Sequence, residues 1–183
     1  MKLIFWLDAD GDLHYAILHE RLKKSPYDPS REHLFVSIFR ELPIFPSEYS
    51  WIQFPSFVDS LARKDAQRQK LDEACLVDSN GRIVRTTAGN IYLLMKGSLV
   101  GVGYADGALK DPICQCVEEA AKTHGYEVKY VVGITEGLLN KASECFIVSS
   151  KSGVTPVAGC GERRFSRDFG VKIADTVNKQ LVF

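Results

Sequence analysis

The apolar residues of this chain fall into short runs that polar residues and turn signals separate, and most of these runs predict strands. Two of them, Lys2–Leu7 and His14–Leu18, flank the acidic, glycine-containing stretch 8–12 and predict a β-hairpin. The stretch 8–12 spaces its carboxylates as a calcium loop does. An EF-hand, however, requires a downstream glutamate where Ile17 stands, so the sequence favours a solvated hairpin turn.

Four segments instead show the period or the end signals of helices: 57–70, 112–124, 135–141 and 168–180. Pro112 suits the first turn of the second helix, and Gly125 suits the position after its end. Further strands are predicted over 34–42, 72–77, 82–84, 91–95, 99–102, 127–132, 145–148 and 153–157. Helices and strands mix without βαβ regularity, so the sequence predicts an α+β fold with a mostly antiparallel sheet.

Size and charge narrow the classes of protein to which this chain can belong. Its 183 residues suit one domain, or one domain and part of a second. The 23 basic and 23 acidic side chains give a formal charge of zero, which argues against a general binder of nucleic acid or anionic membranes. No apolar run reaches 18 residues, so no membrane span is predicted. The apolar run at the start is too short for a secretory signal.

The cysteines indicate buried thiols rather than disulfides or a zinc site. Their number is odd, they lie in apolar segments, and their spacing does not suit a metal: Cys75, Cys114, Cys116, Cys145 and Cys160. Free thiols are typical of a reducing intracellular compartment, so we expect the cytoplasm or an organelle matrix, mitochondrial or plastid.

Seven short motifs follow one another from residue 72 onward. They are DEACLVD at 72–78, NG at 80–81, GNIY at 89–92, DG at 106–107, AAKTHGYEV at 120–128, ASECF at 142–146 and GVTPV at 153–157. Their order and spacing resemble those of the class IV, or fold-type IV, pyridoxal-phosphate enzymes. This family includes the branched-chain and D-amino-acid aminotransferases and aminodeoxychorismate lyase.

The resemblance implies a D-amino-acid aminotransferase-like fold and a division of the chain into two parts. Residues 57–183 would form the family's C-terminal domain. Residues 1–56 resemble only the latter half of its N-terminal domain, whose earlier half normally supplies an arginine for the cofactor phosphate. Members of the family are usually dimeric.

Cofactor binding in this family relies on a Schiff-base lysine and on an acidic residue that keeps the pyridine nitrogen protonated. By the resemblance, the lysine position falls near Trp51 or Ile52, and neither side chain can form an imine. The acidic position falls on Arg85, five residues before Asn90, where a positive charge disfavours a protonated pyridine.

The phosphate of the cofactor is held in this family by a Gly-Ile-Thr turn at a helix N-terminus and by a further hydroxyl. The turn falls on 111–113, where Asp111 adds a negative charge, Pro112 lacks an N–H donor and Ile113 lacks the hydroxyl. The further hydroxyl falls on Ser150, which retains it.

The resemblance therefore implies a degenerate site with no catalytic residue and no bound pyridoxal phosphate. The remnant positions of the pocket are Arg85, Asn90, Ile113, Ser150 and Lys151. The alternative is a relocated Schiff-base lysine at Lys64, Lys70 or Lys151, in which case pyridoxal phosphate would be the cofactor.

Three functions follow from these alternatives. The first is a catalytically inactive aminotransferase-like protein that binds other proteins as a subunit of a larger assembly. The second is an active aminotransferase or aminodeoxychorismate lyase with atypical ligands. The third is a small-molecule or anion-binding module, for which the polar loop 149–153 is a candidate.

Several segments are candidate partner surfaces. The stretch Phe45–Phe57 holds five aromatic residues and is either core or a contact surface. We also expect the strands around 3–7 and 34–42 to leave unpaired edges or an uncovered face, which predicts a protein partner or a homo-oligomer. A cluster of Arg163, Arg164 and Arg167 is either a solvated loop or a patch for an acidic partner or RNA.

Overall fold

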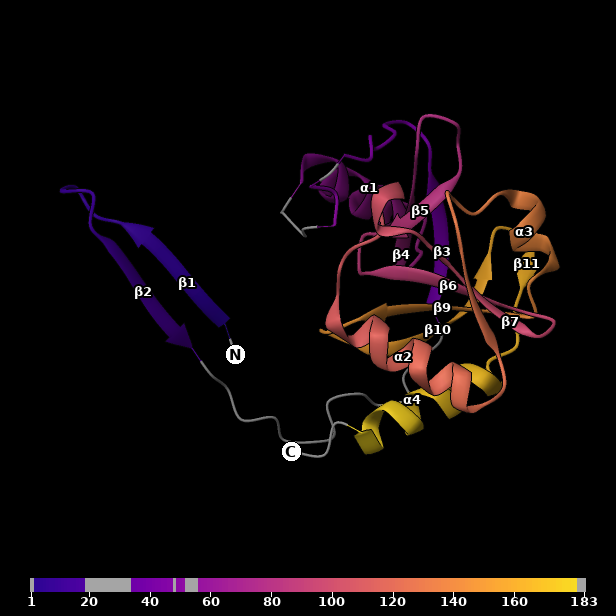
Figure 1. Ribbon diagram of the computed structural model, residues 1–183. Coiled ribbons are helices and arrows are strands. Elements are labelled where there is room, and N and C mark those ends of the chain that lie inside the picture. Colours follow the sequence, from indigo (N-terminus) through magenta and orange to yellow (C-terminus); the bar gives the residue numbers. More distant parts are fainter. Residues whose placement is uncertain (1, 19–33, 48, 52–55, 181–183) are drawn as a thin grey trace.

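The computed structural model describes residues 2–18, 34–47, 49–51 and 56–180, with side chains from residue 4 onward (Figure 1). Strands β1 (Lys2–Leu7) and β2 (Leu13–Leu18) pair antiparallel, with Leu7 opposite Leu13, which confirms the predicted hairpin. The carboxylate of Asp8 accepts the main-chain N–H groups of Asp10 and Asp12, so the acidic loop stabilises its own turn. Figure 1 shows the hairpin standing apart from the other described elements.

The remaining strands of the described chain form one mixed sheet in the order β5-β4-β3-β10-β9-β6-β7-β8, with β11 paired to β10. Their bounds are β3 (Leu34–Phe39), β4 (Glu73–Val77), β5 (Ile83–Thr86), β6 (Asn90–Met95), β7 (Ser98–Val102), β8 (Glu127–Val131), β9 (Glu144–Ser149), β10 (Gly153–Cys160) and β11 (Arg163–Arg164). The predicted α+β class is confirmed. Antiparallel pairs predominate, but β3 runs parallel to both β4 and β10, and β7 runs parallel to β8.

The position of β3 corrects one expectation. We expected the strand around 34–42 to leave an unpaired edge or an uncovered face, whereas β3 lies inside the sheet between β4 and β10, which pairs with it as far as Val36. Val36 and Phe39 are buried because they pack into two different apolar clusters of the core. The predicted domain boundary between residues 56 and 57 stays a prediction, although β3 precedes it and joins the same sheet as β4.

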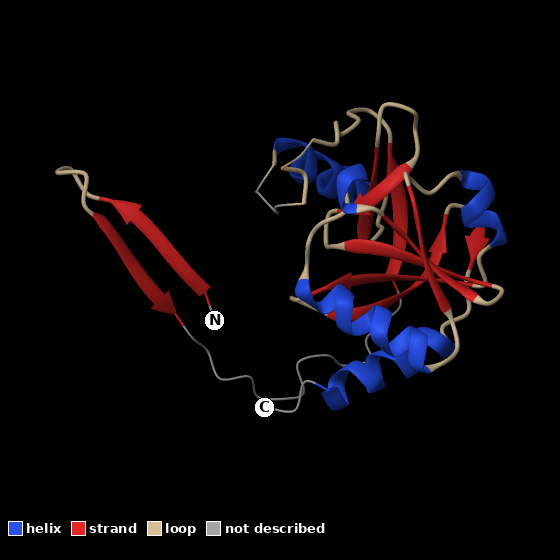
Figure 2. Ribbon diagram, in the orientation of Figure 1, coloured by secondary structure: helices blue, strands red, loops and turns tan. Residues whose placement is uncertain are grey.

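Four helices of the described chain lie against this sheet (Figure 2): α1 (Phe57–Arg68), α2 (Pro112–Thr123), α3 (Glu136–Lys141) and α4 (Asp168–Gln180). A short 3₁₀ turn, η1 (Tyr104–Asp106), precedes α2. Side chains of Ser56, Asp111 and Thr135 accept N–H groups in the first turns of α1, α2 and α3, as their residue types favour. No described helix has the length and apolar character that a membrane span requires.

The helices cover different parts of the sheet. Helices α2 and α4 lie side by side, and their apolar faces pack with β6, β7, β9 and β10 around Val117, Phe146 and Ile173. Helix α1 packs on β3 and β4 through Ala62 and Ala66. The first turns of α1 and α2 thereby lie near β5 and the β9–β10 turn, and these contacts position the residues described next.

Candidate functional site

Arg85 is bound by an internal carboxylate. It lies on β5, and its guanidinium forms two bonds to Asp59 in the first turn of α1, from Nη1 to Oδ1 at 2.6 Å and from Nη2 to Oδ2 at 3.0 Å. Both side chains are largely buried, with 12% and 17% exposed. The hydroxyl of Ser56, the N-cap of α1, also donates to Asp59. Asp59 therefore supplies the acceptor that a buried guanidinium requires.

This pairing determines the ionisation of Asp59. Burial alone would raise the pKa of the Asp59 carboxyl, but the hydrogen bonds from Arg85 and Ser56 and the positive charge of Arg85 outweigh it and lower the pKa. Both partners of the pair are charged at neutral pH, and each satisfies the other.

Asp111 binds a set of donors that converge from two elements. Its carboxylate accepts the N–H of Ile113 at 3.1 Å in α2 and the N–H of Ser150 at 2.7 Å in the β9–β10 turn. The hydroxyl of Ser150 also donates to Asp111. A helix N-terminus, a loop N–H and a hydroxyl thus surround one internal carboxylate, as such groups surround a bound anion.

Trp51 lies beside this cluster. Its carbonyl accepts the N–H of Lys110 at 2.8 Å, and the ammonium of Lys110 lies 5.5 Å from the centre of the Trp51 ring. Ile52, the other candidate for the lysine position, lies outside the described residues.

Asn90 has a structural environment. It is 3% exposed, and its carboxamide bridges the main chain of Leu109, donating to the carbonyl and accepting from the N–H, both at 2.7 Å. It also donates to the sulfur of Cys114 at 3.1 Å. Asn90 therefore joins β6 to the segment that leads into α2.

The lysines considered for relocation are exposed. Lys64 lies on the solvent side of α1, Lys70 follows the end of that helix, and Lys151 lies in the β9–β10 turn. The structure thus brings Ile113 and Ser150 together through Asp111 and holds Arg85 on Asp59. Asn90 lies in the core behind them.

Comparison with known proteins identifies the family. The sequence model of the amino-transferase class IV family matches residues 12–160. This chain belongs to the class IV aminotransferase family. The recognition drawn from the motifs at 72–157 is thereby confirmed. Among curated proteins, none matches the sequence.

Solved structures show the same fold at low sequence identity. A branched-chain aminotransferase from Thermoproteus uzoniensis is 20% identical, with a TM-score of 0.72 over 91% of this chain and 55% of that one. A fold IV transaminase from Curtobacterium pusillum is 16% identical, with a TM-score of 0.74 over 97% and 62%. A hypothetical aminotransferase from Mycobacterium tuberculosis is 19% identical, with a TM-score of 0.72 over 83% and 56%. The chain thus spans little more than half the length of these proteins.

In this class IV family member the predicted cofactor positions do not fit pyridoxal phosphate. The Asp111 carboxylate takes up the donors at Ile113 and Ser150, and a phosphate placed there would meet a like charge. At the position that the resemblance assigns to the acidic partner of the pyridine nitrogen, Arg85 carries a positive charge and is paired with Asp59. Trp51 offers no amine.

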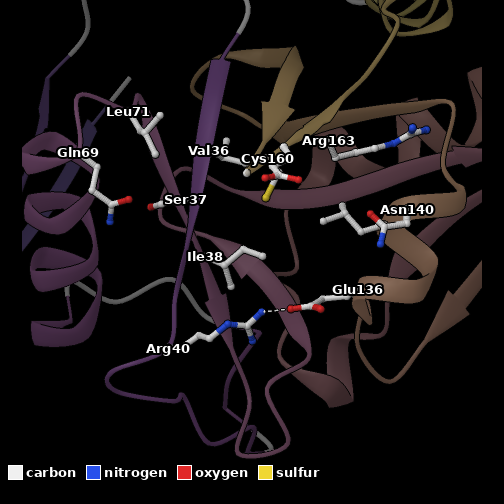
Figure 3. Close-up of a pocket in the computed structure, with 13 residues that line it drawn as sticks. Val36, Ser37, Ile38, Arg40, Gln69, Leu71, Glu136, Asn140, Cys160 and Arg163 are labelled. Carbon is white, nitrogen blue, oxygen red and sulfur yellow. Dashed lines mark hydrogen bonds and ion pairs between the residues drawn. The ribbon is translucent and has the colours of Figure 1, made fainter.

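The structure also contains an open cavity away from these positions (Figure 3). It has a volume of about 430 Å³ and lies along β3, between the end of α1, helix α3 and the β10–β11 turn. None of the predicted positions Arg85, Asn90, Ile113, Ser150 and Lys151 lines it. Within the described ranges, no cluster of three histidine, cysteine or acidic side chains could hold a metal ion.

Sequence reasoning missed two of the residues that matter here. Asp59 could have been found, because serine followed three residues later by an acidic residue is an N-terminal helix signal. That signal places Asp59 in the first turn of α1, but only the sheet order brings it to Arg85. No sequence pattern distinguished Cys160 from the other cysteines in apolar segments, but the structure places it in the wall of the cavity.

Proposed function

We propose that this class IV family protein is not a pyridoxal-phosphate enzyme and instead binds other proteins, as a subunit of a larger assembly or as a homo-oligomer. One observation carries the proposal. At two positions that the family resemblance assigns to cofactor binding, the side chains are already bound by carboxylates of the same chain, Arg85 by Asp59 and Ser150 by Asp111. A buried ion pair is costly to open, so a ligand would have to replace both partners' contacts.

A direct experiment tests whether this protein binds pyridoxal phosphate covalently. After incubation with pyridoxal phosphate and borohydride reduction, we expect no stoichiometric pyridoxyl adduct on any lysine. Peptide mapping distinguishes a specific site from slow surface modification, and a chain unfolded in denaturant gives the background level. A single lysine modified to completion in the folded chain, at Lys64, Lys70, Lys110 or Lys151, would establish the alternative of an active enzyme with atypical ligands.

Exposed apolar side chains support the proposal that this chain binds other proteins. In the stretch that sequence analysis left open between core and contact surface, Phe45, Tyr49 and Phe57 are 74%, 64% and 74% exposed. The hairpin has a face on which Phe5 pairs with Tyr15 and Leu7 pairs with Leu13, and all four side chains are more than half exposed. An isolated two-stranded hairpin is only marginally stable in water, so contact with a further surface would stabilise it.

These exposed apolar side chains predict that the chain self-associates or precipitates at high concentration. The double variant Phe45→Ser, Tyr49→Ser should associate less than the wild type. The double variant removes apolar area that water would otherwise surround. Light scattering after size-exclusion chromatography measures the change. Val132→Ser, at a 51% exposed position outside the stretch, is the matched control. A wild-type chain that stays a monodisperse monomer at high concentration contradicts the proposal.

Three further predictions stay proposals. The reducing intracellular compartment, cytoplasmic or in an organelle matrix, rests on the thiols alone. The proposal that Arg163, Arg164 and Arg167 bind RNA is weakened, because two of these side chains already donate to main-chain carbonyls. Arg163 donates to the carbonyl of Ala142 at 2.6 Å, and Arg164 donates to that of Gly161 at 2.7 Å. The anion-binding alternative is weakened because Asp111 takes up the donors at Ser150.

A further inference from the structure

The cavity of Figure 3 exists because a strand pairing ends early. Strand β10 pairs with β3 only as far as Cys160 opposite Val36. The chain then turns through Gly161, whose φ of +57° suits glycine, into β11. In the described part of the chain, no strand continues β10 beside the rest of β3, so the edge of β3 around Ile38 opens into the cavity.

The walls of the cavity combine apolar and charged groups. Val36, Ile38 and Leu139 supply apolar surface. Figure 3 shows Glu136 and Asn140 projecting from α3 toward β3, and the guanidinium of Arg40 lies 2.5 Å from the Glu136 carboxylate. Arg163 and Glu162 add a second pair of opposite charges. A volume of about 430 Å³ is in the range of small-molecule sites.

Two polar atoms of residues in this wall have no hydrogen-bond partner among the described residues. One is the hydroxyl of Ser37, a residue only 6% exposed. The other is Nε of Arg163, whose guanidinium extends away from β3 and donates to the carbonyl of Ala142 (Figure 3). Buried polar groups are normally paired, and a ligand rich in carbonyl and carboxylate oxygens is one way to pair the Ser37 hydroxyl. The unpaired edge of β3 likewise suits the peptide groups of a ligand.

Cys160 places a nucleophile in this cavity. It lines the cavity although it is only 6% exposed, and it interacts with the fully buried thiol of Cys75 on β4. The Cys75 thiol lowers the pKa of Cys160 despite burial. The positive charge of Arg40 lowers it further, and Glu136 opposes this effect. Cys145, on β9, is a further thiol near Cys160: burial and the charge of Cys160 both raise the pKa of Cys145.

We propose that Cys160 is a site of modification by a small peptide disulfide of the glutathione type, with the cavity holding the peptide. The Cys160 thiolate attacks one sulfur of the disulfide, a new sulfur–sulfur bond forms to Cys160, and the original bond breaks. The leaving thiolate takes up the proton that Cys160 released, and the small disulfide is the only oxidant required. Charges of both signs in the wall match the ammonium and carboxylate groups of the peptide.

The test uses the folded full chain, glutathione disulfide and mass spectrometry with peptide mapping. We expect one glutathionyl group on Cys160, absent in Cys160→Ser and retained in Cys116→Ser, which removes the one cysteine that is not fully buried outside the cavity. Cys75→Ala and Arg40→Met should each slow the reaction, by up to about tenfold if the pKa of Cys160 rises by about one unit.

A second disulfide separates recognition from thiol chemistry. Glutathione disulfide should modify Cys160 faster than uncharged hydroxyethyl disulfide does, while Cys116 reacts similarly with both. Circular dichroism of each variant confirms that the reacting chain is folded. Modification confined to Cys116, or of Cys160 only after unfolding, overturns the proposal. Equal rates for the two disulfides at Cys160 overturn the role of the cavity.

Discussion

Replacing Arg85 with methionine lowers the free energy of unfolding by about 3–5 kcal/mol, because it leaves the carboxylate of Asp59 buried without its ionic partner. Methionine keeps much of the apolar volume of the arginine side chain, so the loss reports on the charge and its hydrogen bonds. Urea denaturation followed by circular dichroism measures the change. Arg68→Met is the matched control. Its side chain is 76% exposed, and its ion pair to Asp65 is 3.9 Å long, so we expect little effect.

The stabilisation by Arg85 should depend on pH in a defined direction. The pKa of Asp59 in the folded chain lies below its ordinary value of 3.8, since the bonds from Arg85 and Ser56 outweigh the effect of burial. A lowered folded-state pKa stabilises the folded chain above the unfolded pKa, and this contribution disappears as the pH falls through the folded value. Wild type and Arg85→Met should therefore differ at neutral pH and converge as the pH falls through the folded-state pKa of Asp59, which lies below 3.8.

Arg85→Glu tests the meaning of the same pair for function. Glutamate restores the acidic residue that the family resemblance places there, but it sets two carboxylates against each other beside α1. We expect a destabilised chain with neither cofactor absorbance nor transaminase turnover. An Arg85→Glu chain that folds normally and gains either would mean that one substitution switches the site off, contrary to the function we propose.

Replacing Asn90 with alanine should be the other strongly destabilising change. It removes both hydrogen bonds to the main chain of Leu109, whose N–H is then left without this partner in a buried segment, whereas its carbonyl still accepts the N–H of Asp111. An unsatisfied buried group costs about 1–3 kcal/mol and a lost hydrogen bond about 0.5–1.5 kcal/mol, so we expect a loss of about 2–4 kcal/mol. Thermal and urea unfolding measure it.

Two comparisons make the result for Asn90 interpretable. Asn140→Ala, at an exposed position of α3, should change stability little. Asn90→Asp keeps the acceptor for the Leu109 N–H and loses the donor to its carbonyl, so it should retain part of the stability. If Asn90→Ala unfolds like wild type, the bridge between β6 and the segment before α2 contributes nothing, and Asn90 would be free for a ligand.

Local sequence patterns determined the elements of this protein and its family. The hairpin at 2–18 followed from two apolar runs about an acidic turn, and α2 followed from Pro112 at its start and Gly125 after its end. The order of the motifs over 72–157 was sufficient to identify the family, because these motifs lie in turns and strands that its members share. The place of Arg85 five residues before Asn90, where the family has an acidic residue, also followed from the resemblance.

Only the tertiary structure decided which residues meet. Arg85 and Asp59 are 26 positions apart, and Asp111 and Ser150 are 39 apart, so no local period relates them. The place of β3 between β4 and β10 depends on the sheet order, which parallel pairing over long connections leaves open in the sequence. The cavity at Cys160 arises because β10 turns away from β3 at Gly161, and hydrophobic periodicity records burial but not where a neighbouring strand ends.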